Sequence, residues 1–154
     1  MVKAAEIVRN EKIDFLLAVG GGSVIDGTKF ITLASCYKGE ASDLFKYGLA
    51  PIPLDVIGKG VPLGTVLTLP ATGSEMNNGA VISYEHGKYP VSSESAFPNF
   101  SILDPTITFT LPKIQVANGV IDLVVASGDP ATATRKALGR LRSSKIANQG
   151  GVIA

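Results

Sequence analysis

The chain has 154 residues, of which 45% are hydrophobic and 18% charged, a composition that excludes intrinsic disorder as the dominant state. This length predicts one domain, and a formal net charge of +1 gives no general attraction to nucleic acid or membranes. The single cysteine, Cys36, excludes an internal disulfide, and no stretch reaches the roughly 18–20 apolar residues of a membrane span. We therefore expect a cytoplasmic protein without a membrane partner.

The N-terminal part of the chain predicts a helix, a strand and a second helix. Residues 3–12 place apolar side chains on one helical face, and residues 14–19 form a short apolar run typical of a strand buried on both faces. Three glycines follow at 20–22, and we expect Ser23 to cap the second helix, with Asp26 in its first turn. The strand over 14–19 is predicted to lie at the centre of an open, mainly parallel sheet, with this helix packed across it.

The rest of the chain alternates apolar runs with turn-forming residues. The predicted elements are a short helix near 43–47, strands at 61–69, 80–84 and 101–103, a hairpin turn at 85–88, and a helix from Leu111-Pro112 to about 125. This order is typical of a doubly wound α/β fold.

The charges divide the chain into two segments. All acidic residues lie at or before Asp129, whereas five of the 14 basic residues follow it. We expect a partial α/β domain over 1–125 and a basic tail over 126–154. Nucleic-acid binding by the tail is a weak alternative, since basic runs more often form solvated surface.

The glycines before Ser23 are the first candidate site. Free backbone N–H groups at a helix N-terminus favour a phosphate, and glycines allow its close approach. The spacing is not G-x-G-x-x-G, because position 25 is isoleucine, and no GxxxxGK[ST] loop is present. A tight strand-to-helix turn without a ligand is an equally good interpretation.

Three other segments carry polar groups of interest. Thr68, Thr72 and Ser74 lie at the end of a buried strand, where α/β sheets bind ligands, although caps and turns also use such residues. Asp122 lies among apolar neighbours on a predicted helix, where it is either paired, a metal ligand or exposed to water. His86, the only histidine, is expected at the surface.

Four segments in order, AVGGGSVIDGTKFI, VPLGTVLTLPATGSEMNNGAVIS, the lysine of HGKYP, and FSILDPTITFTLPKIQVANGVID, resemble the iron-containing (group III) alcohol dehydrogenases. The resemblance is to their NADPH-dependent butanol dehydrogenase and aldehyde reductase branch, and it runs from about Ala4 to Val125. It implies a partial Rossmann-like cofactor domain that lacks the family's C-terminal helical metal domain.

The resemblance also implies site residues and chemistry. Gly21, Gly22 and Ser23 would hold the pyrophosphate of NADP or NAD, Thr68 and Thr72 would contact phosphate and ribose, Lys88 would lie beside the ribose, and Asp122 would be a metal ligand. The implied reaction is metal-assisted hydride transfer to or from a short alcohol or aldehyde, with iron or zinc as the Lewis acid.

The sequence departs from the family pattern at the metal. The pattern D-x-x-x-H places two ligands one helical turn apart, but here the second position is Ala126. We expect a chain truncated at both ends, which binds metal weakly or not at all unless a partner in a homo-oligomer supplies ligands. The alternative is a non-catalytic fragment that keeps a partial nucleotide-phosphate site.

Overall fold

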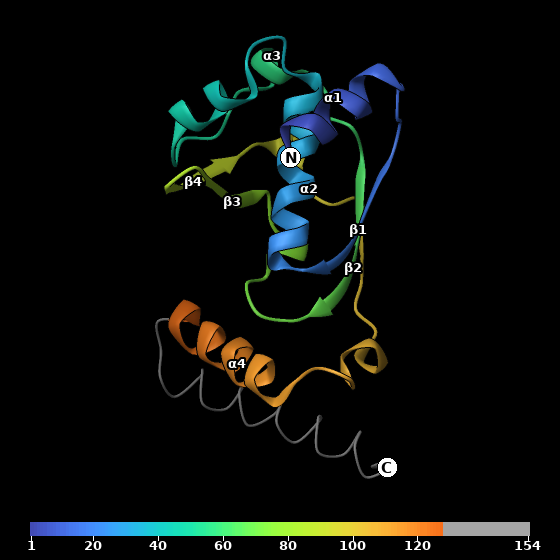
Figure 1. Cartoon of the computed structure of the whole chain (residues 1–154), viewed down its shortest axis with the longest axis vertical. Helices are drawn as coiled ribbons and strands as arrows, with labels where there is room; N and C mark the ends of the chain where they lie inside the picture. Colours follow the sequence, from blue (N-terminus) through green and yellow to red (C-terminus); the bar gives the residue numbers. More distant parts are fainter. Residues whose placement is uncertain (128–154) are drawn as a thin grey trace.

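The computed structural model describes residues 1–127, and in it the long helix α2 runs between two separate sheets (Figure 1). The helices are α1 (Val2–Asn10), α2 (Gly22–Cys36), α3 (Leu54–Ile57) and α4 (Lys113–Ser127). The strands are β1 (Leu16–Gly21), β2 (Leu63–Leu69), β3 (Gly79–Tyr84), β4 (Gly87–Ser92) and β5 (Phe100–Ile102). Four 3-10 helices complete the described part: η1 (Ala41–Tyr47), η2 (Ser74–Met76), η3 (Glu94–Ala96) and η4 (Pro105–Thr108).

The first sheet is parallel and has the order β1-β2-β5. This confirms an α/β fold with a parallel sheet. The prediction that the first strand is central was wrong: within the described residues β1 pairs only with β2, so β2 is the middle strand and β1 an edge. The apolar run predicts a strand, but not how many neighbours that strand has.

The two faces of the parallel sheet differ in cover. Ala18 and Thr65 face α2 and are 1% and 0% exposed, and Ile25 of α2 is fully buried against this face. Leu17 and Val19 alternate with them on the opposite face and are 53% and 57% exposed. The expectation that this strand is buried on both faces was therefore wrong for the described part of the chain, where helices cover one face only.

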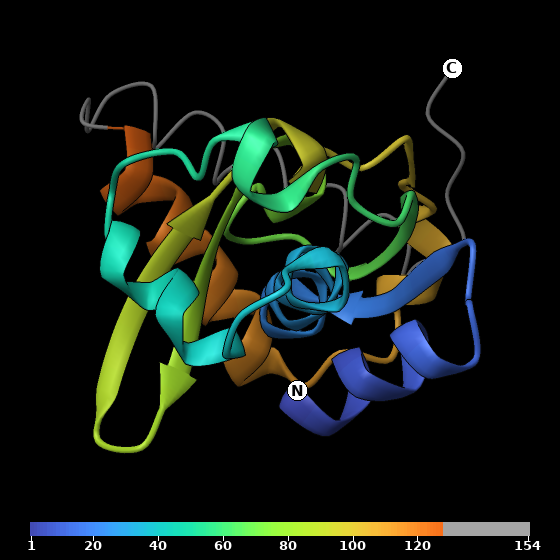
Figure 2. The ribbon, with the colours of Figure 1, turned by 90° about the horizontal axis from the view of Figure 1, so that it is seen from above.

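The second sheet is the antiparallel hairpin of β3 and β4, on the other side of α2 (Figure 2). A larger apolar core fills the space between the hairpin and the helix, with Phe30 and Leu33 on α2 facing Ile82 and Val91. The sequence indicated β3 and the turn after it. It gave no strand signal for β4, whose burial depends on this packing.

Helix α2 begins earlier than the sequence suggested. Gly21 is its N-cap and Gly22 its first residue, so Ser23 lies inside the first turn and no side chain caps the helix. The prediction of Ser23 as the cap was wrong, because the glycines themselves adopt the turn. Asp26 lies in the second turn rather than the first, and its Oδ2 accepts a hydrogen bond from the Val81 N–H at 2.9 Å.

Helix α4 follows η4 and lies below the parallel sheet in the view of Figure 1. The predicted segment boundary at 125 falls within this helix, and residues 128–154 of the basic tail lie outside the described part. Within residues 1–127, no helix is long and apolar enough to cross a membrane. The cytoplasmic location stays a prediction.

Candidate functional site

The carboxyl ends of β1 and β2 bring the glycine turn and the following loop together. Gly21 at the end of β1 pairs with Leu69 at the end of β2, after a register shift between Gly20 and Gly21. In open α/β sheets this edge, where parallel strands end and helices begin, is where ligands bind. Thr68 precedes Leu69 at the same edge and is half-buried.

Gly22 lies directly against Thr72 of the loop after β2. A Cβ atom on Gly22 would lie 2.6 Å from Thr72 Oγ1 and 3.2 Å from Thr72 Cγ2, so only glycine fits here without displacing the threonine. Because no side chain caps α2, the N–H groups of its first turn lie free beside this hydroxyl. The site thus combines backbone donors, the positive end of a helix dipole and an exposed hydroxyl, which together suit a phosphate.

The loop itself is held by local hydrogen bonds. Thr72 Oγ1 lies 2.8 Å from Ser74 Oγ, and it accepts a weak hydrogen bond from the Ser74 N–H at 3.4 Å. These contacts are the turn chemistry that the sequence left open as an alternative. They do not exclude a ligand, because Thr72 is exposed and so is Ser23, the residue after Gly22.

A charged cluster that the sequence did not single out lies beside this loop. Lys29 of α2 is 0% exposed, and its Nζ donates hydrogen bonds to Asn77 Oδ1 and to the Gly79 carbonyl, both at 2.8 Å. Desolvation by burial lowers the pKa of Lys29 to about 8, although the carboxylates of Asp26 and Glu75 act in the opposite direction. The only sequence signal was a lysine on the same stretch of helix as Phe30 and Leu33, which are buried.

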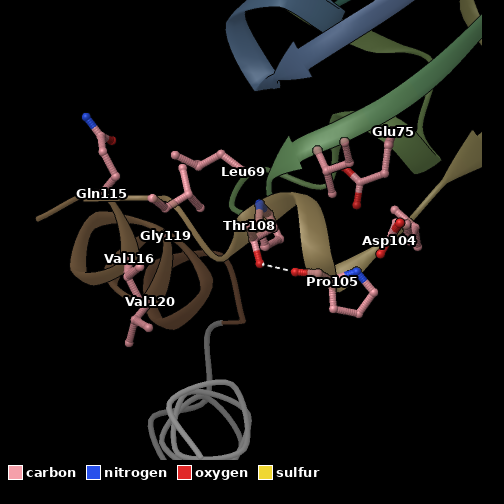
Figure 3. Close-up of a pocket in the computed structure, with 13 residues that line it drawn as sticks. Leu69, Glu75, Asp104, Pro105, Thr108, Gln115, Val116, Gly119 and Val120 are labelled. Carbon is pink, nitrogen blue, oxygen red and sulfur yellow. Dashed lines mark hydrogen bonds between the residues drawn. The ribbon is translucent and has the colours of Figure 1, made fainter. Parts of the chain in front are cut away.

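A pocket of about 290 Å³ opens at the same edge, between the end of β2, η4 and α4 (Figure 3). Its lining is mostly apolar, with Val116 and Val120 of α4 at one end and the carboxylates of Glu75 and Asp104 at the other in this view. Hydrogen bonds from Thr106, whose hydroxyl and N–H both donate to Asp104 Oδ1, lower the pKa of the Asp104 carboxyl. The pocket joins the glycine turn through the segment from Leu69 to Glu75, and no sequence motif indicated it.

None of the remaining candidate residues belongs to the first turn of α2 or to the loop at Thr72, which together we call the phosphate cradle. Lys88 is exposed on β4 opposite Ser83, near the turn of the hairpin, and His86 is exposed in that turn as expected. Asp122 is exposed on α4, and its role as a metal ligand stays a prediction. Within residues 1–127, no group of three or more His, Cys, Asp or Glu side chains is placed to hold a metal ion.

A parallel sheet with a glycine-led helix at its carboxyl edge defines the class of open α/β proteins, which bind ligands at that edge. The model of the family described as iron-containing alcohol dehydrogenase matches residues 1–105, and the chain belongs to this family. The resemblance drawn from the sequence motifs is thereby confirmed.

Relatives within the family are similar over most of the chain. The NADPH-dependent aldehyde reductase YqhD of Escherichia coli is 47% identical over 127 residues, which are 81% of this chain and 32% of that protein. The probable NADH-dependent butanol dehydrogenase 1 of Bacillus subtilis is 48% identical over 124 residues, 79% of this chain and 30% of that protein. This chain therefore spans about a third of the length of these relatives.

Solved structures agree with the fold. The crystal structure of E. coli YqhD superposes with a TM-score of 0.73 at 48% identity, over 80% of this chain and 31% of that one. The NADH-dependent butanol dehydrogenase A of Thermotoga maritima superposes with a TM-score of 0.70 at 41% identity, over 80% of this chain and 30% of that one.

Proposed function

We propose that this chain is the nucleotide-binding part of an NAD(P)-dependent alcohol dehydrogenase or aldehyde reductase, and that Gly21, Gly22 and Ser23 hold the pyrophosphate of the cofactor. The observation that carries the proposal is the contact between Gly22 and Thr72 beside the free first-turn N–H groups of α2. Relatives named as NADPH-dependent and NADH-dependent support both cofactors, and NADP is the first candidate because YqhD is NADPH-dependent.

The other proposed cofactor contacts come from the loop after β2 and from the β3-β4 hairpin. Thr72 offers an exposed hydroxyl to a phosphate, and half-buried Thr68, near the end of β2, is proposed to contact the nicotinamide ribose. Lys88 is proposed beside the ribose, for which its exposed amine on the hairpin is available. The apolar pocket walled by Val116 and Val120 suits a flat, weakly polar part of the nucleotide.

The reaction we propose is hydride transfer between the nicotinamide and a short alcohol or aldehyde. The bound cofactor supplies the hydride chemistry, and the residues of this chain bind and orient its phosphates. The family's iron, or zinc in its place, does not fit the residues present: Asp122 is exposed, Ala126 stands one turn further along α4, and residues 1–127 hold no ligand cluster. We therefore derive no metal-assisted step from this chain.

A second candidate function is nucleotide binding without turnover, and the substitution of alanine for a ligand histidine at position 126 favours it. The two candidates agree on cofactor binding and differ on catalysis. A partner chain in a homo-oligomer that brings metal ligands to Asp122 would restore the first.

The test combines binding with turnover. The chain is first titrated with NADPH and with NADH to measure binding. Turnover is then assayed with NADPH and a short aldehyde in three arms: with added Fe²⁺ or Zn²⁺, with a chelator, and with the Asp122→Ala variant. Cofactor binding without turnover in every arm supports the second candidate. Turnover supports the first, and its loss with the chelator or in Asp122→Ala would show that another chain completes the metal site. Absence of binding to either nucleotide refutes both.

A further inference from the structure

Helix α2 contacts the segment that follows β2, from Thr72 to Gly79, at two places. At its start, Gly22 lies against Thr72. Seven residues later, about 10 Å along the helix axis at 1.5 Å per residue, Lys29 donates hydrogen bonds to Asn77 and to the Gly79 carbonyl. The segment between Thr72 and Gly79 is therefore attached to one rigid helix at both ends.

The second attachment reaches back to Thr72 through one side chain. Asn77 accepts from Lys29 with Oδ1 and donates from Nδ2 to the Gly73 carbonyl at 3.1 Å. Gly73, the residue after Thr72, has φ +74°, a left-handed conformation that glycine adopts readily. The hydrogen bond from Asn77 to the Gly73 carbonyl therefore helps to fix the backbone next to Thr72. Lys29, Asn77 and Gly73 thus form one continuous link from the second half of α2 to the residue beside the threonine.

Burying an amine is costly, so the position of Lys29 needs compensation. Its two acceptors are fixed by the loop and the start of β3, and Asp26, one turn earlier on α2, accepts from the Val81 N–H of the same strand. With a pKa of about 8, the amine is protonated at neutral pH and donates to both acceptors. An apolar side chain at position 29 would remove the Lys29 donor from both acceptors and leave Asn77 Oδ1 with the Gly79 N–H at 3.0 Å.

We propose that Lys29, acting through Asn77, is a positioning residue that holds Thr72 at the first turn of α2 and so sets the width of the phosphate cradle. The proposal rests on the proposed function, since it assigns a role in that same site. Lys29 itself does not touch the cofactor. Its effect on binding passes through the hydroxyl of Thr72.

A double-mutant cycle tests this, with NADPH as the probe and its dissociation constant as the readout. Lys29→Met is expected to weaken binding about ten-fold in the wild-type background and less than about two-fold in the Thr72→Ala background, because the residue that it positions is then absent. Lys29→Arg, which keeps a donor, is expected to restore part of the affinity. Asn77→Ala, at an exposed residue, breaks the same link and provides a second variant should Lys29→Met not fold.

The matched control is Leu33→Ala, which removes a fully buried side chain from the same helix on the side of the main core. It is expected to lower the free energy of unfolding without changing the NADPH affinity of the folded chain. An equal effect of Lys29→Met in both backgrounds, or an effect matched by Leu33→Ala, would show a merely structural role and overturn the proposal.

Amide hydrogen exchange of the nucleotide-free chain separates this proposal from the proposed function. Residues 73–79 are expected to exchange faster in Lys29→Met and in Asn77→Ala, whereas β1 and β2 keep their protection. Unchanged exchange with normal NADPH binding overturns the positioning role alone. If both variants exchange faster but the wild-type chain does not bind NADPH, the proposed function is refuted, and with it the role in the cradle.

Discussion

The contact between Gly22 and Thr72 leads to a sharp prediction for a single methyl group. In Gly22→Ala the new Cβ would lie 2.6 Å from Thr72 Oγ1, closer than such atoms approach one another, so the threonine side chain must rotate away. Thr72 is exposed, so its side chain has room to rotate. The rotation breaks the contact of its Oγ1 with Ser74 Oγ, and the hydroxyl leaves the cradle. The expected loss is one hydrogen bond to a charged group.

Such a hydrogen bond contributes about 1.5–3 kcal/mol, which corresponds to a roughly 10- to 150-fold rise in the dissociation constant of NADPH. The assay is a fluorescence titration with NADPH, accompanied by urea unfolding to verify the fold. Gly27→Ala is the matched control in the same helix, because its Cβ would meet only Met1 Sδ at 3.4 Å. It is expected to keep the affinity and to stabilise the chain by about 0.5–1 kcal/mol.

A dissociation constant for Gly22→Ala within two-fold of the wild-type value would refute the reasoning. It would mean that the phosphate does not sit where the glycine turn meets the loop. The same change in both glycine variants would also count against it, because only Gly22 lies in the cradle.

Three further predictions concern stability. The pKa of Lys29 is about 8 in the folded chain and about 10.5 in the unfolded chain, so the unfolded chain binds more protons between these pH values. The free energy of unfolding of the wild type should therefore rise by up to about 3 kcal/mol relative to that of Lys29→Met between pH 8 and pH 10.5. A difference that stays constant with pH would contradict this prediction. Arg9 donates to three carbonyl oxygens at the end of α2, and Arg9→Met should lower the free energy of urea unfolding by about 1 kcal/mol, with Arg9→Lys in between. Gly119→Ala should destabilise α4, because the Cβ of Ala at position 119 would lie 2.7 Å from the Pro70 carbonyl oxygen, whereas Gly27→Ala should stabilise α2. Equal shifts in melting temperature for the two variants would argue against the packing of α4 on Pro70.

Local sequence patterns determined the types of most elements. The apolar runs gave β1 and β2 within about two residues, the amphipathic pattern gave α1, and the turn residues at 85–88 marked the hairpin. Four ordered motifs gave the family, and the glycines marked the phosphate candidate. These features lie within short stretches of chain, where the spacing of apolar residues and the steric freedom of glycine decide the backbone conformation.

Contacts between distant residues decided the rest. Within the described residues, β1 is an edge strand because its only hydrogen-bonded neighbour is β2. β3 is not part of the parallel sheet, because it pairs with β4 in a separate hairpin on the other side of α2. Lys29 is buried because Asn77, 48 residues away, accepts from it, and the pocket exists only because α4 returns to the end of β2. A side chain's burial and pKa depend on which groups fold over it, so the sequence alone supplied the residues of the cradle and the tertiary structure decided which of them meet.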